Sequence, residues 1–122
     1  MGLIVSGSSG NMPTGSGSER LRRAVLQGNN NAQTEILSGS PGHIYTVISI
    51  ICAEQQNLAG TIQIFWVNGS DTTRILSTTA IGAYETFVFS DRFVLEEDDD
   101  LDVQNTTTDC DWYVSYIDQD WT

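Results

Sequence analysis

From residue 34 onward the sequence is a succession of short runs rich in β-branched and aromatic residues, each ended by turn-forming residues. No stretch of helical length in this region carries apolar residues at helical spacing. Strand-length runs repeated at intervals of about ten residues are typical of antiparallel sandwiches and jelly rolls. The sequence therefore predicts one all-β domain, an antiparallel β-sandwich or jelly roll. The expected strands are residues 34–37, 43–53, 61–67, 72–78, 85–95, 100–104 and 110–118.

Three of these runs carry specific expectations. Residues 43–53 are apolar nearly throughout, which predicts a central strand buried on both faces. Asn68 and Gly69 separate two β-patterned runs, which is a strong hairpin signal. The last run alternates, so one set of side chains is expected to face the core. That set is Cys110, Trp112, Val114 and Tyr116.

The first 33 residues have a different composition and are expected to form an N-terminal arm and linker, with the β-sandwich domain over 34–122. Residues 5–18 are mostly Gly and Ser with one Pro, which predicts a flexible arm. Its apolar tip is either a frayed terminus or an anchor that orders on a partner. Residues 19–28 fit a short helix or a strand equally well. The tip consists of Leu3, Ile4 and Val5.

Charge separates these two parts of the chain. The protein has 16 acidic residues and five arginines without any lysine, a net charge of −11. Three arginines, Arg20, Arg22 and Arg23, accompany Glu19 in the first 34 residues, and the remainder is strongly acidic. An acidic surface repels phosphate backbones, so no nucleic-acid partner is expected. No run approaches the ~18 apolar residues needed to span a bilayer, so no membrane partner is expected either.

Five consecutive acids occupy residues 96–100, between two apolar runs. A calcium site would use carboxylates at alternate positions, which Asp98, Asp100 and Asp102 provide, but the EF-hand spacing with its Gly and distal Glu is absent. A catalytic carboxylate pair needs two distinct environments, which a solvated turn does not supply. The sequence favours a solvated turn between strands without a metal ion.

No pattern of a catalytic centre appears elsewhere. His43 is the single histidine and precedes a predicted strand, so we interpret it as a strand-start residue. No nucleophile elbow, phosphate-binding loop or zinc spacing is present. Cys52 and Cys110 match neither metal nor redox spacing and are expected as two buried thiols. The prediction is a non-enzymatic protein without a cofactor.

Most of the Trp and Tyr residues fall at alternating strand positions, which favours core or subunit packing over a sugar-stacking face. Trp121 lies next to the C-terminus and is harder to bury inside a sandwich. We therefore expect Trp121 to contact a neighbouring chain.

The order of segments resembles small β-sandwich virion proteins of tailed bacteriophages. The resemblance covers about residues 34–118: a Pro-Gly turn before HIYTVISIICAEQQN, the hairpin TIQIFWVNGSDTTRIL, and then GAYETFVFSDRFVLEEDDDLDVQNTTTDCDWYVSYID. In those proteins a Gly-Asp pair often occupies the turn held here by residues 96–100.

This resemblance implies a capsid decoration (cement) protein, located on the capsid surface of the virion and assembled in the host cytoplasm. It implies the major capsid protein and neighbouring copies as partners, arranged as a homotrimer. The expected contact residues are Leu3, Ile4, Val5, Arg20, Arg22, Arg23 and Trp121. The alternative is a glycan- or receptor-binding β-sandwich module of a phage tail fibre.

Overall fold

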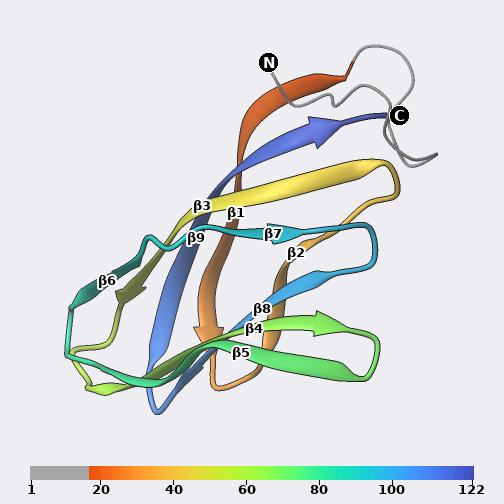
Figure 1. Ribbon diagram of the computed structural model, residues 1–122. Helices are drawn as coiled ribbons and strands as arrows, with labels where there is room; N and C mark the ends of the chain where they lie inside the picture. Colours follow the sequence, from red (N-terminus) through yellow and green to blue (C-terminus); the bar gives the residue numbers. More distant parts are fainter. Residues whose placement is uncertain (1–16) are drawn as a thin grey trace.

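The structure is a computed structural model that describes residues 17–122. Within this range the chain forms nine β-strands without a helix (Figure 1). None of the described residues belongs to a helix long and apolar enough to cross a membrane. The strands are β1 (Ser18–Asn30), β2 (Thr34–Ser38), β3 (His43–Glu54), β4 (Gly60–Asn68), β5 (Asp71–Ile81), β6 (Thr86–Phe89), β7 (Phe93–Leu95), β8 (Asp100–Thr106) and β9 (Asp109–Asp120).

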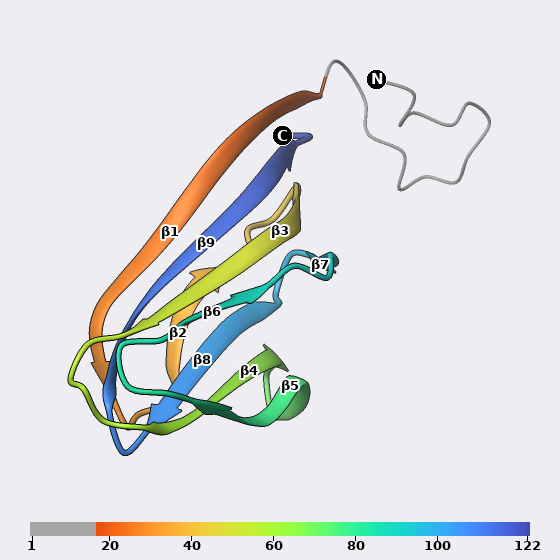
Figure 2. The same cartoon turned by 90° about the vertical axis from the view of Figure 1, so that its left-hand side faces the viewer.

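The strands pair into two antiparallel sheets that pack face to face (Figure 2). The first sheet, sheet A, has the order β1-β9-β3-β6, and β7 also pairs with β3. The second, sheet B, has the order β2-β8-β4-β5. With β6 and β7 taken as one interrupted strand, each sheet has four strands in the order of a jelly roll. The predicted antiparallel sandwich is therefore confirmed.

Residues 19–28, for which helix and strand remained open, lie within β1, a strand at the edge of sheet A. β1 pairs with β9 from Ser18 opposite Asp120 to Asn30 opposite Asp109. Hydrogen bonding to β9 along the whole strand decides its conformation, because these ten residues have similar propensities for helix and for strand. The sandwich thus begins at Ser18, earlier than the boundary expected at residue 34. The predicted flexible arm over residues 5–18 falls almost entirely within 1–16, outside the described residues.

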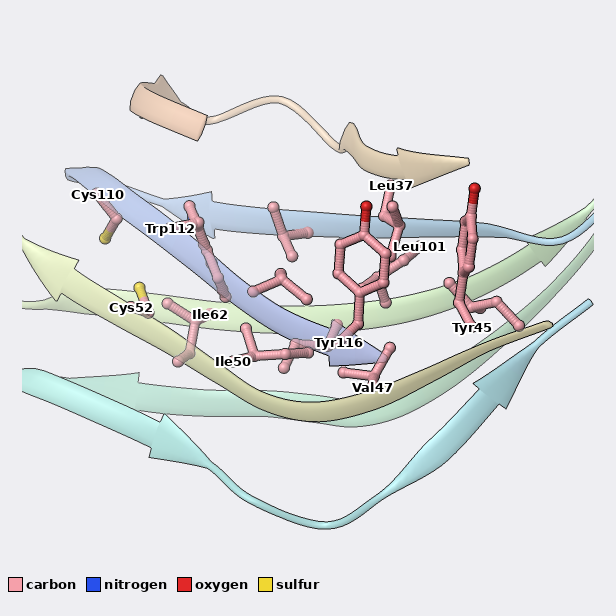
Figure 3. Packing of buried hydrophobic residues seen from close by; sticks show 14 of the residues in the cluster. Leu37, Tyr45, Val47, Ile50, Cys52, Ile62, Leu101, Cys110, Trp112 and Tyr116 are labelled. Atoms are coloured by element: carbon pink, nitrogen blue, oxygen red, sulfur yellow. The ribbon is translucent and has the colours of Figure 1, made fainter. Parts of the chain in front are cut away.

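The hydrophobic core fills the space between the inner faces of the two sheets (Figure 3). The predicted inward set of the last strand is confirmed, since all four of its side chains are buried in this cluster. β3 differs from its prediction, because only one of its faces is buried in the core. The opposite face of β3 is half-buried, since no second layer of the described chain covers it. The buried residues of β3 are Tyr45, Val47, Ile50, Cys52 and Glu54.

Two other strands depart from simple alternation. The run expected as one strand over 85–95 is split into β6 and β7, which both pair with β3. In β4, Ile62 and Ile64 face the core, but Phe65 on the opposite face is also buried. The Arg74 guanidinium lies 5.7 Å from the centre of the Phe65 ring and covers this outer side. The hairpin at Asn68 is confirmed, and Gly69 has a positive φ of 59° that suits glycine.

A buried polar network holds one end of the sandwich together around Asn105, whose side chain is fully buried. The Asn105 Nδ2 donates to the backbone oxygens of Asn29 (2.6 Å) and Thr108 (2.5 Å). Its Oδ1 accepts from Trp112 Nε1 (3.0 Å) and Asn29 Nδ2 (2.9 Å). One side chain therefore joins β1 to the β8–β9 hairpin with all of its hydrogen-bonding groups paired.

Candidate interaction surface

Three of the five arginines lie on β1, the open edge of sheet A. Arg20 and Arg22 lie on the same face as Ala24, which packs against the core, whereas Arg23 lies on the outer face. Arg22 Nη1 donates to Asp118 Oδ2 at 3.2 Å, and the Asp118 side chain is buried. Arg22 therefore has a partner inside its own chain, while Arg20 and Arg23 are exposed.

Asp118 also connects β9 to β3 through His43. Its Oδ1 lies 2.7 Å from His43 Nδ1, and His43 Nε2 lies 3.6 Å from Asp120 Oδ1. Hydrogen bonds from the side chain and backbone of Thr122, followed by the charges of His43 and Arg20, hold the pKa of Asp120 below its usual range. His43 is the first residue of β3, which confirms it as a strand-start residue. The cluster ties three strands together beside the exposed arginines.

Trp121 follows β9 at the same end of sheet A. Its backbone N–H donates to the Gly42 oxygen at 2.8 Å, and its half-buried ring lies against Gly17, where a Cβ would overlap it. This places Trp121 beside the start of β1. Its contact with a neighbouring chain stays a prediction. Leu3, Ile4 and Val5, the apolar tip, lie outside the described residues.

The acidic run forms the turn between β7 and β8, as predicted, but one of its carboxylates is buried. Glu96, Glu97 and Asp98 are exposed, whereas Asp99 is only 8% exposed. Asp99 Oδ2 accepts the Glu96 N–H and Oδ1 accepts Asn68 Nδ2, both at 2.9 Å. Although burial raises the pKa of Asp99, hydrogen bonds from Asn68, the Glu96 backbone and the Trp66 side chain lower it below its usual value. Asp99 thus anchors an otherwise solvated turn.

The turn also packs on the loop before β3. Gly39 N–H donates to the Asp99 carbonyl oxygen at 2.7 Å, and a Cβ on Gly39 would lie 2.7 Å from the Glu97 carbonyl oxygen. Only glycine permits this approach between two backbones. The acidic turn therefore owes its position to backbone contacts and to Asp99.

The candidate calcium ligands have other partners. Asp100 Oδ1 accepts from the Ser38 hydroxyl at 2.7 Å, and Asp102 Oδ2 accepts from Gln33 Nε2 at 2.9 Å. Burial, followed by the charges of Asp100 and Asp102, raises the pKa of Glu35 on the neighbouring strand. Among residues 17–122 no group of three potential ligands has the geometry of a metal site. That the turn holds no metal ion stays a prediction, which melting in the presence of calcium tests.

Replacing Asp99 with alanine should lower the free energy of unfolding by about 1–3 kcal/mol, because buried donors lose their acceptor. Asp98→Ala, in the exposed part of the same turn, is the matched control and should change stability by less than about 0.5 kcal/mol. Both are measured by urea unfolding, and the melting temperature of the wild type is measured with and without calcium. Equal losses in the two variants, or a large rise in melting temperature with calcium, would contradict this assignment of the turn.

The aromatic side chains do not gather at one place. Trp112, Tyr45 and Tyr116 are buried, and the Tyr45 and Tyr116 rings lie 5.0 Å apart in the core. Tyr84 and Tyr113 are exposed, but Tyr84 lies in the loop before β6 and Tyr113 on the outer face of β9. Most of the aromatic area therefore serves the core.

The two cysteines are free and buried, as predicted. Cys52 on β3 and Cys110 on β9 point toward each other at one end of the core (Figure 3). The neighbouring Cys110 sulfur and burial raise the pKa of the Cys52 thiol. Both side chains belong to the buried core cluster, so the pair contributes to packing.

The prediction missed the outer face of sheet A as a surface feature. It carries Leu21 (74% exposed), Val88 (54%), Val25 (50%), Val94 (48%) and Tyr113 (39%). Two features of the sequence could have indicated this face. Tyr113 and Ile117 alternate with the inward residues of the last strand, and residues 43–53 are apolar on both faces. That signal suggested burial on both faces, but among residues 17–122 no layer covers the outer face of sheet A.

Comparisons with known proteins add information on the fold. No protein-family model and no curated protein matches the chain. A chain from Bacillus endospore appendages, described as a novel family of disulfide-linked pili, is similar in structure with a TM-score of 0.53. It is 13% identical and covers 88% of this chain and 91% of its own. Eiger TNF from S. frugiperda is 14% identical with a TM-score of 0.40, covering 84% of this chain and 92% of its own. The likeness to the appendage chain extends to the fold alone.

Proposed function

We propose that this chain is a non-enzymatic structural subunit of a larger assembly, and specifically a capsid decoration (cement) protein of a tailed phage. In this role the β-sandwich sits on the outer shell of the head. The open β1 edge and the preceding N-terminal segment contact the major capsid protein or an adjacent copy.

The observation that carries this proposal is the separation of charge on the surface of the sandwich. Arg20 and Arg23 are exposed along β1, whereas the outer face of sheet B presents Glu35, Asp100 and Asp102. Arginine suits a joint between proteins because its planar guanidinium pairs with a carboxylate through two hydrogen bonds. The basic edge attracts an acidic partner to one side of the domain. The acidic surface on the other side repels such a partner and stays in contact with solvent.

The phage part of the proposal comes from the sequence resemblance over about residues 34–118. The segment that carries the apolar tip, Leu3 to Val5, precedes β1 in the sequence, and β1 begins at Ser18. An arm of about 16 residues reaches at most ~55 Å when extended, which is enough to cross a joint between capsid subunits. Several such contacts acting together gain avidity on a symmetric shell.

Deletion of residues 1–16 tests the arm, because β1 begins after the deletion and the sandwich should still fold. The double variant Arg20→Ser/Arg23→Ser tests the edge. We expect each to bind undecorated capsids at least about tenfold more weakly in co-sedimentation, through loss of apolar contacts or of charge pairing. The matched control is Arg92→Ser, since Arg92 is exposed between β6 and β7 on the opposite edge of sheet A.

Wild-type binding by both variants would remove the arm and the edge from the attachment mechanism. Failure of the intact protein to bind capsids, together with binding to host glycans, would replace this proposal with the tail-fibre module. The folded state of every variant is checked by circular dichroism before binding is measured.

A further inference from the structure

The outer face of sheet A carries two largely apolar rows of side chains, separated by one polar row, and we call this surface the sheet A patch. Two rows of register partners cross all four strands of the sheet. The first row is Val25, Tyr113, Ile51 and Val88, and the second row is Leu21, Ile117, Thr46 and Val94. Between them, Arg23 and Ser49 both pair with Ser115. Five of the seven large hydrophobic side chains exposed among residues 17–122 lie on this patch.

The centre of the sheet A patch is uncharged in a chain that carries a net charge of −11. Its outward charges lie along β1 and at the start of β9, and they have both signs. Glu19 and Arg23 lie on β1, and Asp111 lies on β9, where its carboxylate accepts the Gly28 N–H at 2.7 Å. An uncharged surface of exposed apolar rows with a mixed charged margin has the anatomy of a protein interface.

We propose that the sheet A patch is a self-association surface on which two copies of this chain pack face to face about a two-fold axis. The other surfaces of the described chain do not complement the patch. The outer face of sheet B is acidic, and the two remaining exposed hydrophobic residues, Leu58 and Tyr84, lie in separate loops. A copy-to-copy contact that buries the patch is therefore patch to patch, which is an isologous contact. Opposite charges at the margin, such as Arg23 and Asp111, are available to pair across the axis.

The size of the patch fits such a dimer. The outer face of sheet A with its charged margin is four strands wide, about 4.8 Å apart, and about nine residues long from Asp111 to Gln119 at ~3.3 Å per residue, which makes roughly 570 Å². Two copies would then bury about 1,100 Å², close to the lower end of the range for specific interfaces. Interfaces below about 1,200 Å² belong mostly to weak or transient complexes, so we expect a reversible dimer and not a permanent one.

The dimer follows from the sandwich alone and does not depend on capsid attachment. It replaces the trimer that the phage resemblance implies. The salt dependence of the dimer distinguishes an apolar contact from charge pairing. Two acidic chains repel each other, so salt that screens this repulsion should strengthen a dimer held by apolar contacts. Pairing of the basic β1 edge with an acidic surface would weaken as salt is added.

The test is sedimentation equilibrium of the purified full-length chain at low and at moderate sodium chloride, without capsids. We expect a monomer–dimer equilibrium that tightens with salt. Tyr113→Arg and Val88→Arg should each weaken the dimer at least about tenfold. Both substitutions make the chain less acidic, so increased net repulsion cannot explain the loss.

The matched control is Thr78→Arg, an equal charge change at an exposed position of β5 in sheet B, which should leave the dimer constant unchanged. Melting temperatures close to that of the wild type show that the variants fold. A monomer at about 100 μM, a trimer, a dimer that salt weakens, or unchanged dimerisation of both patch variants would overturn the proposal. Because capsid binding is measured separately, failure here leaves the decoration role standing, and the reverse also holds.

Discussion

Replacing Asn105 with alanine is expected to lower the free energy of unfolding by about 3–5 kcal/mol, since the change removes four hydrogen bonds and strands buried partners. Trp112 Nε1 and Asn29 Nδ2 lose an acceptor, and the carbonyl oxygens of Asn29 and Thr108 lose a donor. Domains of this size are stable by only about 5–15 kcal/mol, so the loss is a large share of the total. Urea or thermal unfolding followed by tryptophan fluorescence measures it.

Asn105→Asp separates shape from hydrogen bonding at the same position. The aspartate keeps the volume and the acceptor for Trp112 but cannot donate to the two carbonyl oxygens, and it places a charge in a fully buried site. It should therefore be as destabilising as the alanine. Gln104→Ala, on the opposite face of β8, is the control and should change stability by less than about 0.5 kcal/mol. Stability of Asn105→Asp close to wild type would show that volume, not donation, is what the site needs.

Acid should destabilise the sandwich through Glu54, which is 3% exposed at the end of β3. Burial raises its pKa, but donation from the Thr108 hydroxyl and from the backbone N–H groups of Tyr84, Gln56 and Leu58 outweighs burial and lowers the pKa to about 2, from an ordinary 4.5. The Tyr84 and Gln56 nitrogens lie 2.5 Å and 2.6 Å from the carboxylate. The carboxylate thus holds the loops around β3 to the β8–β9 turn.

The pH dependence follows from that shift. In the unfolded chain Glu54 takes up a proton near its ordinary pKa of 4.5, whereas in the folded chain it does so only near about 2. The stabilisation by Glu54 is therefore complete above pH 4.5 and is lost progressively as the pH falls toward 2. Glu54→Gln removes most of this stabilisation at neutral pH, so its melting temperature should fall by several degrees.

Comparing the pH dependence of stability in the wild type and in Glu54→Gln separates the contribution of Glu54 from that of the other acidic residues. Unfolding by urea is measured from pH 7 down to pH 2 for the wild type and for Glu54→Gln. The stability difference between them should be largest at neutral pH and should shrink below pH 4.5. Glu97→Gln, in the exposed acidic turn, should stay parallel to the wild type throughout. If the difference in unfolding free energy between the wild type and Glu54→Gln stays constant with pH, the charge of the carboxylate does not stabilise the fold.

Much of the fold was predictable because its signals are local. Alternation in residues 110–118 predicts which side chains of β9 enter the core, and Asn68-Gly69 predicts the β4–β5 hairpin. The buried thiols also follow from position within strand-like runs. Each of these features depends on residues close together in the chain, so the local sequence pattern is enough to predict it.

The candidate surfaces were only partly predictable, because they depend on distant partners. The arginines of β1 are conspicuous in the sequence because the chain has few basic residues. The ion pair of Arg22 with Asp118, however, joins two residues that are 96 positions apart in the sequence. The acidic run reads as uniformly solvated, yet Asp99 is buried because Asn68 approaches it from another hairpin. Neither partner is visible in the neighbouring sequence.

The sequence by itself determined the all-β character, the main turns and the inward face of the last strand, since period-two alternation and turn chemistry act over a few residues. Only the tertiary structure decided that β1 is a strand, because its balanced propensities yield to the ladder with β9. It also decided that β3 has one outer face without cover. Whether an apolar face is core or surface depends on what packs above it, and among residues 17–122 no layer lies over the outer face of sheet A.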